Sequence, residues 1–242
     1  MKHIVKFSGG AASAVVAKLV IDEYGHDDVI LLYSDTKSEH PDADRFRAQV
    51  CKFLDHEMTV VADGRDLWEL IEHFHVLPSM FMPYCTTTLK QRPADKFLKA
   101  VGDHTQYLGF STSEIRRAQR AMARVECDGG KIRFPLIEQG IPSDECKRII
   151  RDDWRICLPE PYKHLEHNNC IPCFKAGSLR YWKTVAKYYP EQFERACVAE
   201  ETHGGTSYTV IKGKTLRQIK EMSDQEIGMF PDEDTTPCMC AV

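Results

Sequence analysis

The sequence predicts an α/β protein with a twisted parallel sheet and helices on both faces, followed by a small cysteine-rich, mostly helical C-terminal region. Two observations lead to this class. Short apolar runs alternate with helix-length amphipathic segments through the first two thirds of the chain, which is typical of parallel strands joined by helices. Near Cys157 this alternation gives way to a segment rich in proline, asparagine and cysteine. We therefore expect one domain over residues 1–155 and a distinct region over residues 156–242.

The expected elements alternate in a regular order. Strands are expected at residues 3–7, 29–33, 59–62, 106–110 and 131–136, where apolar side chains dominate. Helices with an apolar stripe are expected at residues 11–24, 42–54, 66–74, 90–100, 112–124 and 143–151. Pro93 fits only the first turn of its helix, and Ser143 is the expected N-cap of the last one. The C-terminal region is expected to hold helices at 178–188 and 190–202 and a hairpin at 208–214.

Composition and charge narrow the class of function. The chain has 242 residues and a net charge of −4, so it lacks the overall basic excess of many nucleic-acid-binding proteins. No apolar run approaches the roughly 18 residues of a membrane span, and the first residues lack the apolar core of a signal peptide. We expect a cytoplasmic protein with no membrane partner. Ten cysteines are unusual in that reducing compartment, and clustered ones there indicate metal or redox chemistry.

A glycine-containing loop joins the first expected strand to the first helix. Its residues are Ser8, Gly9, Gly10, Ala11, Ala12 and Ser13. Two glycines permit a tight turn and the close approach of a ligand, and the start of the helix offers free N–H groups to a phosphate. An ordinary strand-to-helix turn has the same composition, so the local sequence leaves both interpretations open. The loop matches neither the Walker pattern nor GxGxxG.

Two close cysteine pairs lie in the C-terminal region, at Cys170-x-x-Cys173 and Cys238-x-Cys240. The first spacing lets two thiolates face one metal across a tight turn, and the second pair completes a set of four ligands. Zinc, an iron–sulfur cluster and a redox dithiol all suit such ligands, so the spacing does not choose among them. A chain without metal is the remaining interpretation.

Basic side chains gather in two segments. The arginines of the expected helix 112–124 suit phosphate or sulfate as well as a solvated surface. Residues 175–187 mix four basic side chains with a tyrosine and a tryptophan. Such a mixture holds single-stranded nucleic acid in some proteins and packs a core in others.

Four motifs follow one another along the chain. They are Ser8-Gly9-Gly10-x-x-Ser13, Tyr33-Ser34-Asp35-Thr36, the segment 85–93 (CTTTLKQRP), and Gly109-Phe110 followed by Glu114, Arg116 and Arg117. In this order they resemble the PP-loop SGGxDS, the strand-ending Asp-Thr, the CCxxxKxxP segment and the G-x-R-x-x-E-S-x-x-R region of the phosphoadenylyl-sulfate (PAPS) reductase branch of the adenine nucleotide α-hydrolase superfamily. The segment Asn168-Asn169-Cys170-x-x-Cys173 resembles the NNCxxC segment of phage and bacterial PAPS reductase-like proteins.

The resemblance implies a HUP-type, Rossmann-like sheet and a role for each motif. ATP or a related adenine nucleotide, with magnesium, would bind at Ser8, Gly9, Gly10, Ala11, Ala12, Ser13, Asp35, Thr36, Gly109, Phe110 and Glu114. Lys90, Arg116 and Arg117 would stabilise charge on the α-phosphate. Cys85 becomes a fifth candidate ligand, so Cys85, Cys170, Cys173, Cys238 and Cys240 compete for the four places around a [4Fe–4S] cluster, with zinc as the alternative.

Three departures from the family pattern bear on the reaction. Ala12 replaces the PP-loop aspartate, Thr86 replaces the second cysteine of the CC pair, and the reductase motif ECG[IL]H occurs nowhere in the sequence. We therefore expect an ATP-binding enzyme that adenylates a substrate, releases pyrophosphate and transfers sulfur at an iron–sulfur site. A nucleic acid is one candidate acceptor, and a sulfur donor or reductant protein is an expected partner.

Two alternatives remain open. One is a reductase that releases sulfite from adenylyl sulfate or PAPS, with a cysteine thiolate as nucleophile. The other is a non-catalytic nucleotide-binding or interaction protein with a structural metal. The sequence leaves the oligomeric state open, a homo-oligomer included.

Overall fold

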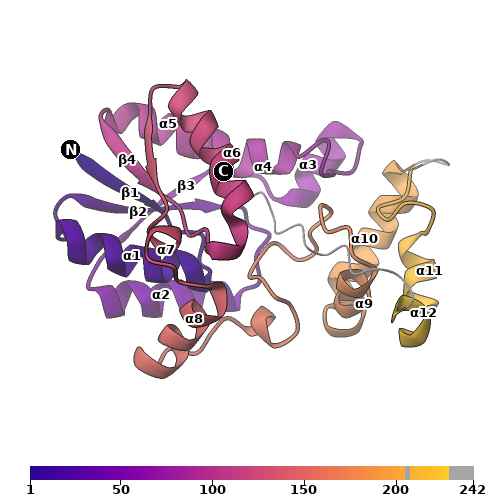
Figure 1. The fold of residues 1–242 in the computed structure, drawn as a ribbon. Helices are drawn as coiled ribbons and strands as arrows, with labels where there is room; N and C mark the ends of the chain where they lie inside the picture. The colour runs from indigo at the N-terminus through magenta and orange to yellow at the C-terminus, as the bar shows by residue number, and fades with distance from the viewer. Residues whose placement is uncertain (205–207, 229–242) are drawn as a thin grey trace.

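The computed structural model describes residues 1–204 and 208–228 and is built around one parallel sheet (Figure 1). The strand order is β3-β2-β1-β4-β5, and each neighbouring pair is parallel. The strands are β1 (Lys2–Lys6), β2 (Val29–Asp35), β3 (Met58–Ala62), β4 (His104–Tyr107) and β5 (Lys131–Arg133). The predicted α/β class with a parallel, Rossmann-like sheet is confirmed.

Helices cover both faces of the sheet, because successive side chains of a strand point to opposite sides. Val5 of β1 lies in a core on one face, and its neighbour Ile4 lies in a core on the other. The first core includes residues of α1 (Ala11–Tyr24), α2 (Asp42–Leu54), α7 (Pro135–Glu138) and α8 (Ser143–Arg148). The second face packs against α5 (Arg92–Val101) and α6 (Ile115–Cys127).

The C-terminal helices form a second core beside the sheet (Figure 1). They are α9 (Leu179–Tyr188), α10 (Pro190–His203), α11 (Leu216–Glu221) and α12 (Asp224–Gly228). Trp182 is fully buried in this core, which also contains Leu67 and Ile71 of α3 (Leu67–Phe74). The helix α3 therefore packs with the C-terminal helices although it lies early in the sequence. The domain boundary at residue 155 stays a prediction.

The helix that carries Lys90 begins earlier than expected. A continuous helical segment runs from α4 (Tyr84–Thr86) through a π-helical turn, η1 (Thr87–Gln91), into α5. Pro93 has no N–H for the carbonyl four residues back, and its ring would clash with that carbonyl in a regular helix. The wider π turn removes this conflict, and such turns are frequent at functional sites.

Other expectations about local structure need correction. The expected strand 131–136 ends at Arg133, because Pro135 cannot donate to the ladder and instead starts α7. Ser143 is not the N-cap of α8: Pro142 holds the extended backbone of that position, and Ser143 is the first helical residue. The expected hairpin is a single antiparallel bridge between Ile211 and Lys214. Short helical turns also occur at η2 (Thr112–Glu114), η3 (Ile149–Asp153) and η4 (Glu160–Lys163).

Across the described part of the chain, none of the helices combines the length and the apolar character needed to cross a bilayer.

Glu200 joins the C-terminal elements to one another. Its carboxylate is buried and accepts the N–H groups of Val210 at 2.8 Å and Leu216 at 2.7 Å. We predict that Glu200→Gln lowers the free energy of unfolding by about 1–3 kcal/mol, because one accepting oxygen becomes an NH₂ group facing a donor. Urea unfolding followed by tryptophan fluorescence measures this. The control, Glu201→Gln, removes an exposed ion pair with Arg217 and should cost less than about 1 kcal/mol. Equal costs for both variants would contradict the prediction.

Candidate functional site

The loop between β1 and α1 is a tight, internally bonded turn. Gly9 has φ of +73°, a left-handed conformation that favours glycine. A Cβ atom at Gly9 would also lie 2.8 Å from a guanidinium nitrogen of Arg47. Ser13 Oγ donates to the Gly10 carbonyl at 2.9 Å, and Ser8 Oγ donates to Ser13 Oγ at 3.2 Å. Both the backbone and its surroundings therefore require glycine at this point of the loop.

Two residues from the segment after α8 hold this loop from outside. Asn168 Nδ2 donates to the Gly9 carbonyl at 3.0 Å, and the N–H of Ala11 donates to the hydroxyl of Tyr162 at 3.2 Å. Burial raises the pKa of Tyr162, so the phenol stays neutral. Tyr162 thus takes one of the helix N–H groups that the sequence assigns to a phosphate. Asn168 Oδ1 is buried without a hydrogen-bond partner among the described residues.

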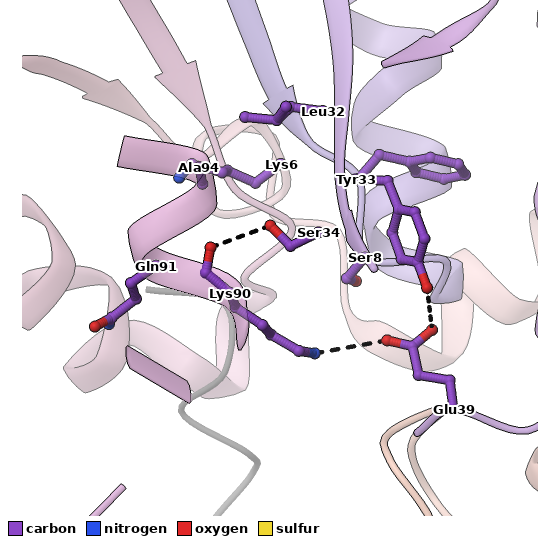
Figure 2. Close-up of a pocket in the computed structure, with 10 residues that line it drawn as sticks. Lys6, Ser8, Leu32, Tyr33, Ser34, Glu39, Lys90, Gln91 and Ala94 are labelled. Carbon is purple, nitrogen blue, oxygen red and sulfur yellow. Dashed lines mark hydrogen bonds and ion pairs between the residues drawn. The ribbon is translucent and has the colours of Figure 1, made fainter. Parts of the chain in front are cut away.

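A buried carboxylate links the loop to the helical segment that carries Lys90 (Figure 2). Glu39 accepts from Arg47 at 2.7 Å and from the Tyr33 hydroxyl at 3.2 Å, and it lies 3.6 Å from the Lys90 ammonium. The Arg47 guanidinium also lies over the Tyr33 ring, 4.0 Å from its centre. Only 5% of the Glu39 and Arg47 side chains is exposed, so this is a desolvated ion pair.

Lys90 remains a cation in this environment. Burial alone would lower the pKa of its ammonium, but the Glu39 carboxylate and the nearby cysteine thiols outweigh burial and raise the pKa above its ordinary value. Lys90 is therefore available as a fixed positive charge. Such a charge at a nucleotide site stabilises phosphate oxygens without moving in the reaction.

A narrow pocket of about 50 Å³ lies between the ends of β1 and β2 and the start of α5 (Figure 2). Ser8, Tyr33, Glu39, Lys90 and Gln91 contribute polar side chains to it, and Leu32 and Ala94 contribute apolar ones. The carboxyl ends of parallel strands are where ligands bind in open α/β sheets. This pocket is therefore the candidate nucleotide pocket.

Other predicted nucleotide-binding residues lie around this pocket rather than in its wall. Asp35 accepts the N–H of Lys37 at 2.8 Å, and Thr36 Oγ1 lies 3.4 Å from Cys170 Sγ. Gly109 packs on the first turn of α1, where a Cβ atom would lie 2.8 Å from the Ser13 nitrogen. Gly109 therefore lets β4 end directly against the helix that follows the loop.

The segment after β4 forms a cluster of its own. Glu114 accepts the N–H of Ser111 at 3.0 Å and pairs with Arg117, whose guanidinium lies 4.5 Å from the centre of the Phe110 ring. Arg116 is exposed. The structure thus packs Phe110, Glu114 and Arg117 together outside the nucleotide pocket, and it leaves Arg116 at the surface.

A second cavity brings three of the five candidate metal ligands together. Cys85, Cys170 and Cys173 line it, together with Lys90 and Lys175. Burial raises the pKa of all three thiols, and the two lysines oppose that effect. Three thiols beside two buried cations fit a thiolate-bound, negatively charged cofactor, because the lysines offset its charge.

The described residues contain no group of three His, Cys, Asp or Glu side chains close enough for one metal ion. A cubane cluster gives each thiolate its own iron and so needs more widely spaced ligands than a single zinc ion does. Cys238 and Cys240 lie outside the described residues. The predicted ligand set therefore remains a prediction.

The loop Cys170–Cys173 makes hydrogen bonds both to the segment after β2 and to the C-terminal helix α9. The Ile171 N–H donates to the Ser38 carbonyl at 3.1 Å, and Glu39 and Cys170 form an antiparallel bridge. The N–H of Cys173 donates to the Tyr181 hydroxyl at 2.6 Å. Tyr181 thus positions the cysteine loop and Trp182 fills the core, so neither ring of the basic and aromatic segment 175–187 is a free stacking surface.

Several site residues escaped prediction from sequence. Arg47 had a usable signal, because it stands on the apolar stripe of α2 beside Phe46 and Val50, where a charge must be paired. Lys6 likewise ends an apolar strand. Glu39 and Tyr162 had no local signal, because their roles depend on contacts with distant segments.

Comparison with protein families identifies this architecture. Residues 2–138 match the model of the phosphoadenosine phosphosulfate reductase domain, and the chain belongs to this family. The matched span runs from β1 to α7, so it contains the whole sheet, the glycine loop and Lys90, whereas Cys170 and Cys173 lie outside it. Family membership associates the chain with nucleotide-related sulfur metabolism. A comparison with functionally curated proteins gave no significant match.

Glu39 and Asp44 offer a matched test of the buried ion pair, since both contact Arg47. We predict that Glu39→Gln lowers the free energy of unfolding by about 3–5 kcal/mol, because two buried cations lose their carboxylate. Asp44 is 79% exposed, so Asp44→Asn should cost less than about 1 kcal/mol. Chemical denaturation of the two variants at neutral pH measures the difference. A Glu39→Gln variant as stable as Asp44→Asn would show that the pair does not hold the site.

Proposed function

We propose that this chain is an enzyme that adenylates an acceptor with ATP and then transfers sulfur to it at the cysteine cavity. The observation that carries this proposal is the position of Lys90, whose side chain borders both the nucleotide pocket and the cavity of Cys85, Cys170 and Cys173. An adenylated group in the nucleotide pocket and a sulfur atom in the cysteine cavity would therefore both lie beside the Lys90 ammonium. Membership of the PAPS reductase family supports the nucleotide and sulfur components.

The first step would be adenylation at the glycine loop. An oxygen of the acceptor attacks the α-phosphorus of ATP, the new O–P bond forms, and the bond to the β-phosphate breaks as magnesium pyrophosphate leaves. The Lys90 ammonium and the backbone N–H groups of the glycine loop, other than the Ala11 N–H that donates to Tyr162, would stabilise the charge that develops on the α-phosphate. Glu39 contributes by keeping Lys90 charged and in place.

The second step would replace the activated oxygen with sulfur. Hydrosulfide attacks the acceptor carbon, the C–S bond forms, and the C–O bond breaks with AMP as leaving group, so no electrons are exchanged. A sulfur donor partner would supply the hydrosulfide. A [4Fe–4S] cluster held by only three thiolates, those of Cys85, Cys170 and Cys173, would leave one iron free to bind that sulfur. Lys175, which donates to Thr86 Oγ1 at 2.6 Å, would offset the charge of the thiolates.

One observation favours a second candidate, a nucleotide-binding protein without turnover. Tyr162 takes the Ala11 N–H, and Ala12 stands where the family motif has its aspartate. Both features reduce the number of groups available to the phosphates and magnesium. Tight binding of ATP with no product would support this candidate.

We predict that anaerobically purified protein contains a [4Fe–4S] cluster, with about four irons and four sulfides per chain and absorption near about 400 nm. Serine substitution of Cys85, Cys170 or Cys173 should each remove most of the iron. The control, Cys127→Ser, changes an exposed, isolated cysteine, and this variant should retain its iron. Serine variants of Cys238 and Cys240 test whether a fourth thiolate binds the cluster, and iron retained in both variants would leave one iron open for sulfur. One zinc per chain and no iron would contradict the cluster.

We predict that pyrophosphate is released from Mg–ATP only when an acceptor is present, with transfer RNA, single-stranded DNA and small carboxylates as the first acceptors to test. Lys90→Met should reduce the rate at least about 100-fold, as for loss of a preorganised electrostatic group. The matched control Lys96→Met removes an exposed lysine of α5 and should leave the rate of pyrophosphate release unchanged. Sulfite release from adenylyl sulfate or PAPS, without pyrophosphate release, would overturn the proposal in favour of a reductase.

A further inference from the structure

A third, larger cavity is a groove between α5 and α6, on the sheet face opposite α1. Its volume is about 500 Å³, which falls within the usual range of small-molecule sites. The floor is formed by His104, Gln106 and Leu108, which share one face because they are two residues apart, and by Ile132 of β5. The walls come from α5 and α6. Lys6 and Gln91 line both this groove and the nucleotide pocket, so the two are neighbours.

The floor of this groove is polar where packing alone predicts an apolar surface. β4 is an interior strand of the parallel sheet, and such strands are normally apolar on both faces because helices cover them. Its other face is buried, with Tyr107 in the α1 core and Thr105 also buried. On the groove face, Gln106 and His104 line the open groove, and none of the helices in the described part of the chain covers them. An amide on such a floor suits hydrogen bonding to a ligand.

Lys6 places a positive charge at the inner end of the groove. Within residues 1–204 and 208–228, its ammonium makes no hydrogen bond and no ion pair. The charges that act on it are those of Asp95, which raises its pKa, and Arg124, which lowers it, and these two side chains pair with each other at 3.8 Å. Burial lowers the pKa of Lys6 to about 8, so the ammonium is still mainly charged at neutral pH. The Lys6 side chain is only partly buried, so an anionic ligand in the groove can reach its ammonium and pair with it.

We propose that this groove binds a nucleotide, with its phosphate at Lys6 and its base on the apolar side chains beside Gln106. The charged side chains that line the groove are three basic ones and two carboxylates, which favours an anionic ligand. They are Lys6, Lys99, Arg124, Asp95 and Asp128. Leu98, Leu108, Val125 and Ile132 supply apolar contact for a flat ring. The site is argued from the groove alone and does not depend on the proposed reaction.

The nucleotide has two sources with the same chemistry, a free mononucleotide or one residue of a single strand. Calorimetry separates them by titrating 5′-UMP, inorganic phosphate and an octanucleotide into the full chain, with a non-hydrolysable ATP analogue present to fill the nucleotide pocket. Binding of 5′-UMP supports a free ligand, and binding of the octanucleotide alone supports a strand. Binding of none of the three probes overturns the proposal.

Variants assign the binding to this groove. Lys6→Met and Gln106→Leu should each weaken binding at least about tenfold, as expected for loss of a charged or buried polar contact. Lys96→Met, on the exposed side of α5, and Lys90→Met, in the other pocket, should leave it unchanged. Thermal unfolding without ligand serves as the folding control, since Lys6→Met removes a partly buried charge that makes no ion pair within the described residues and should be no less stable than the parent. Loss of binding in Lys90→Met but not in Gln106→Leu would place the ligand in the nucleotide pocket and overturn the proposal.

Discussion

The carboxylate of Glu39 is the contact on which the rest of the site depends. It is buried between two cations, Arg47 and Lys90, and it is the point where three parts of the chain meet. Arg47 fills the space beside Gly9, so the glycine loop is shaped by a side chain that Glu39 holds. Lys90 borders both cavities, so the same carboxylate also sets where they adjoin. Separating these charges in a buried setting would be costly, so we expect the three side chains to stay together.

The short connection between β2 and α2, which carries Ser38 and Glu39, also contacts the C-terminal region. Glu39 forms the bridge to Cys170, and the Ser38 carbonyl accepts the N–H of Ile171. The Ser38 hydroxyl accepts the N–H of Leu67, where α3 begins, and α3 in turn shares a core with α9 to α11. The CxxC loop is thus positioned from the end of a sheet strand. This explains how residues outside the matched family span come to adjoin the nucleotide pocket.

Much of the fold was predictable because its signals act over a few residues. The alternation at Ile4 and Val5 reflects the two covered faces of a parallel strand, and the apolar stripe of α2 reflects its single buried face. The backbone conformation before Pro93 was not predictable. A helix that begins just before Pro93 and a longer helix with a π turn there both avoid a clash between the proline ring and the carbonyl four residues back. The role of Trp182 also required the structure, since an aromatic ring beside lysines suits a nucleic-acid surface and a core equally well.

By itself the sequence determined the order of strands and helices, the glycine loop and the CxxC spacing, because local backbone preference and periodicity decide these. Only the tertiary structure decided which charges lie together. Glu39, Arg47 and Lys90 come from separate segments, and within the described residues Lys6 makes no ion pair although it lines a groove between α5 and α6. Burial strengthens the interactions between these charges, because the effective dielectric constant is lower inside the protein. Burial in turn depends on how the whole chain packs, which no short stretch of sequence records.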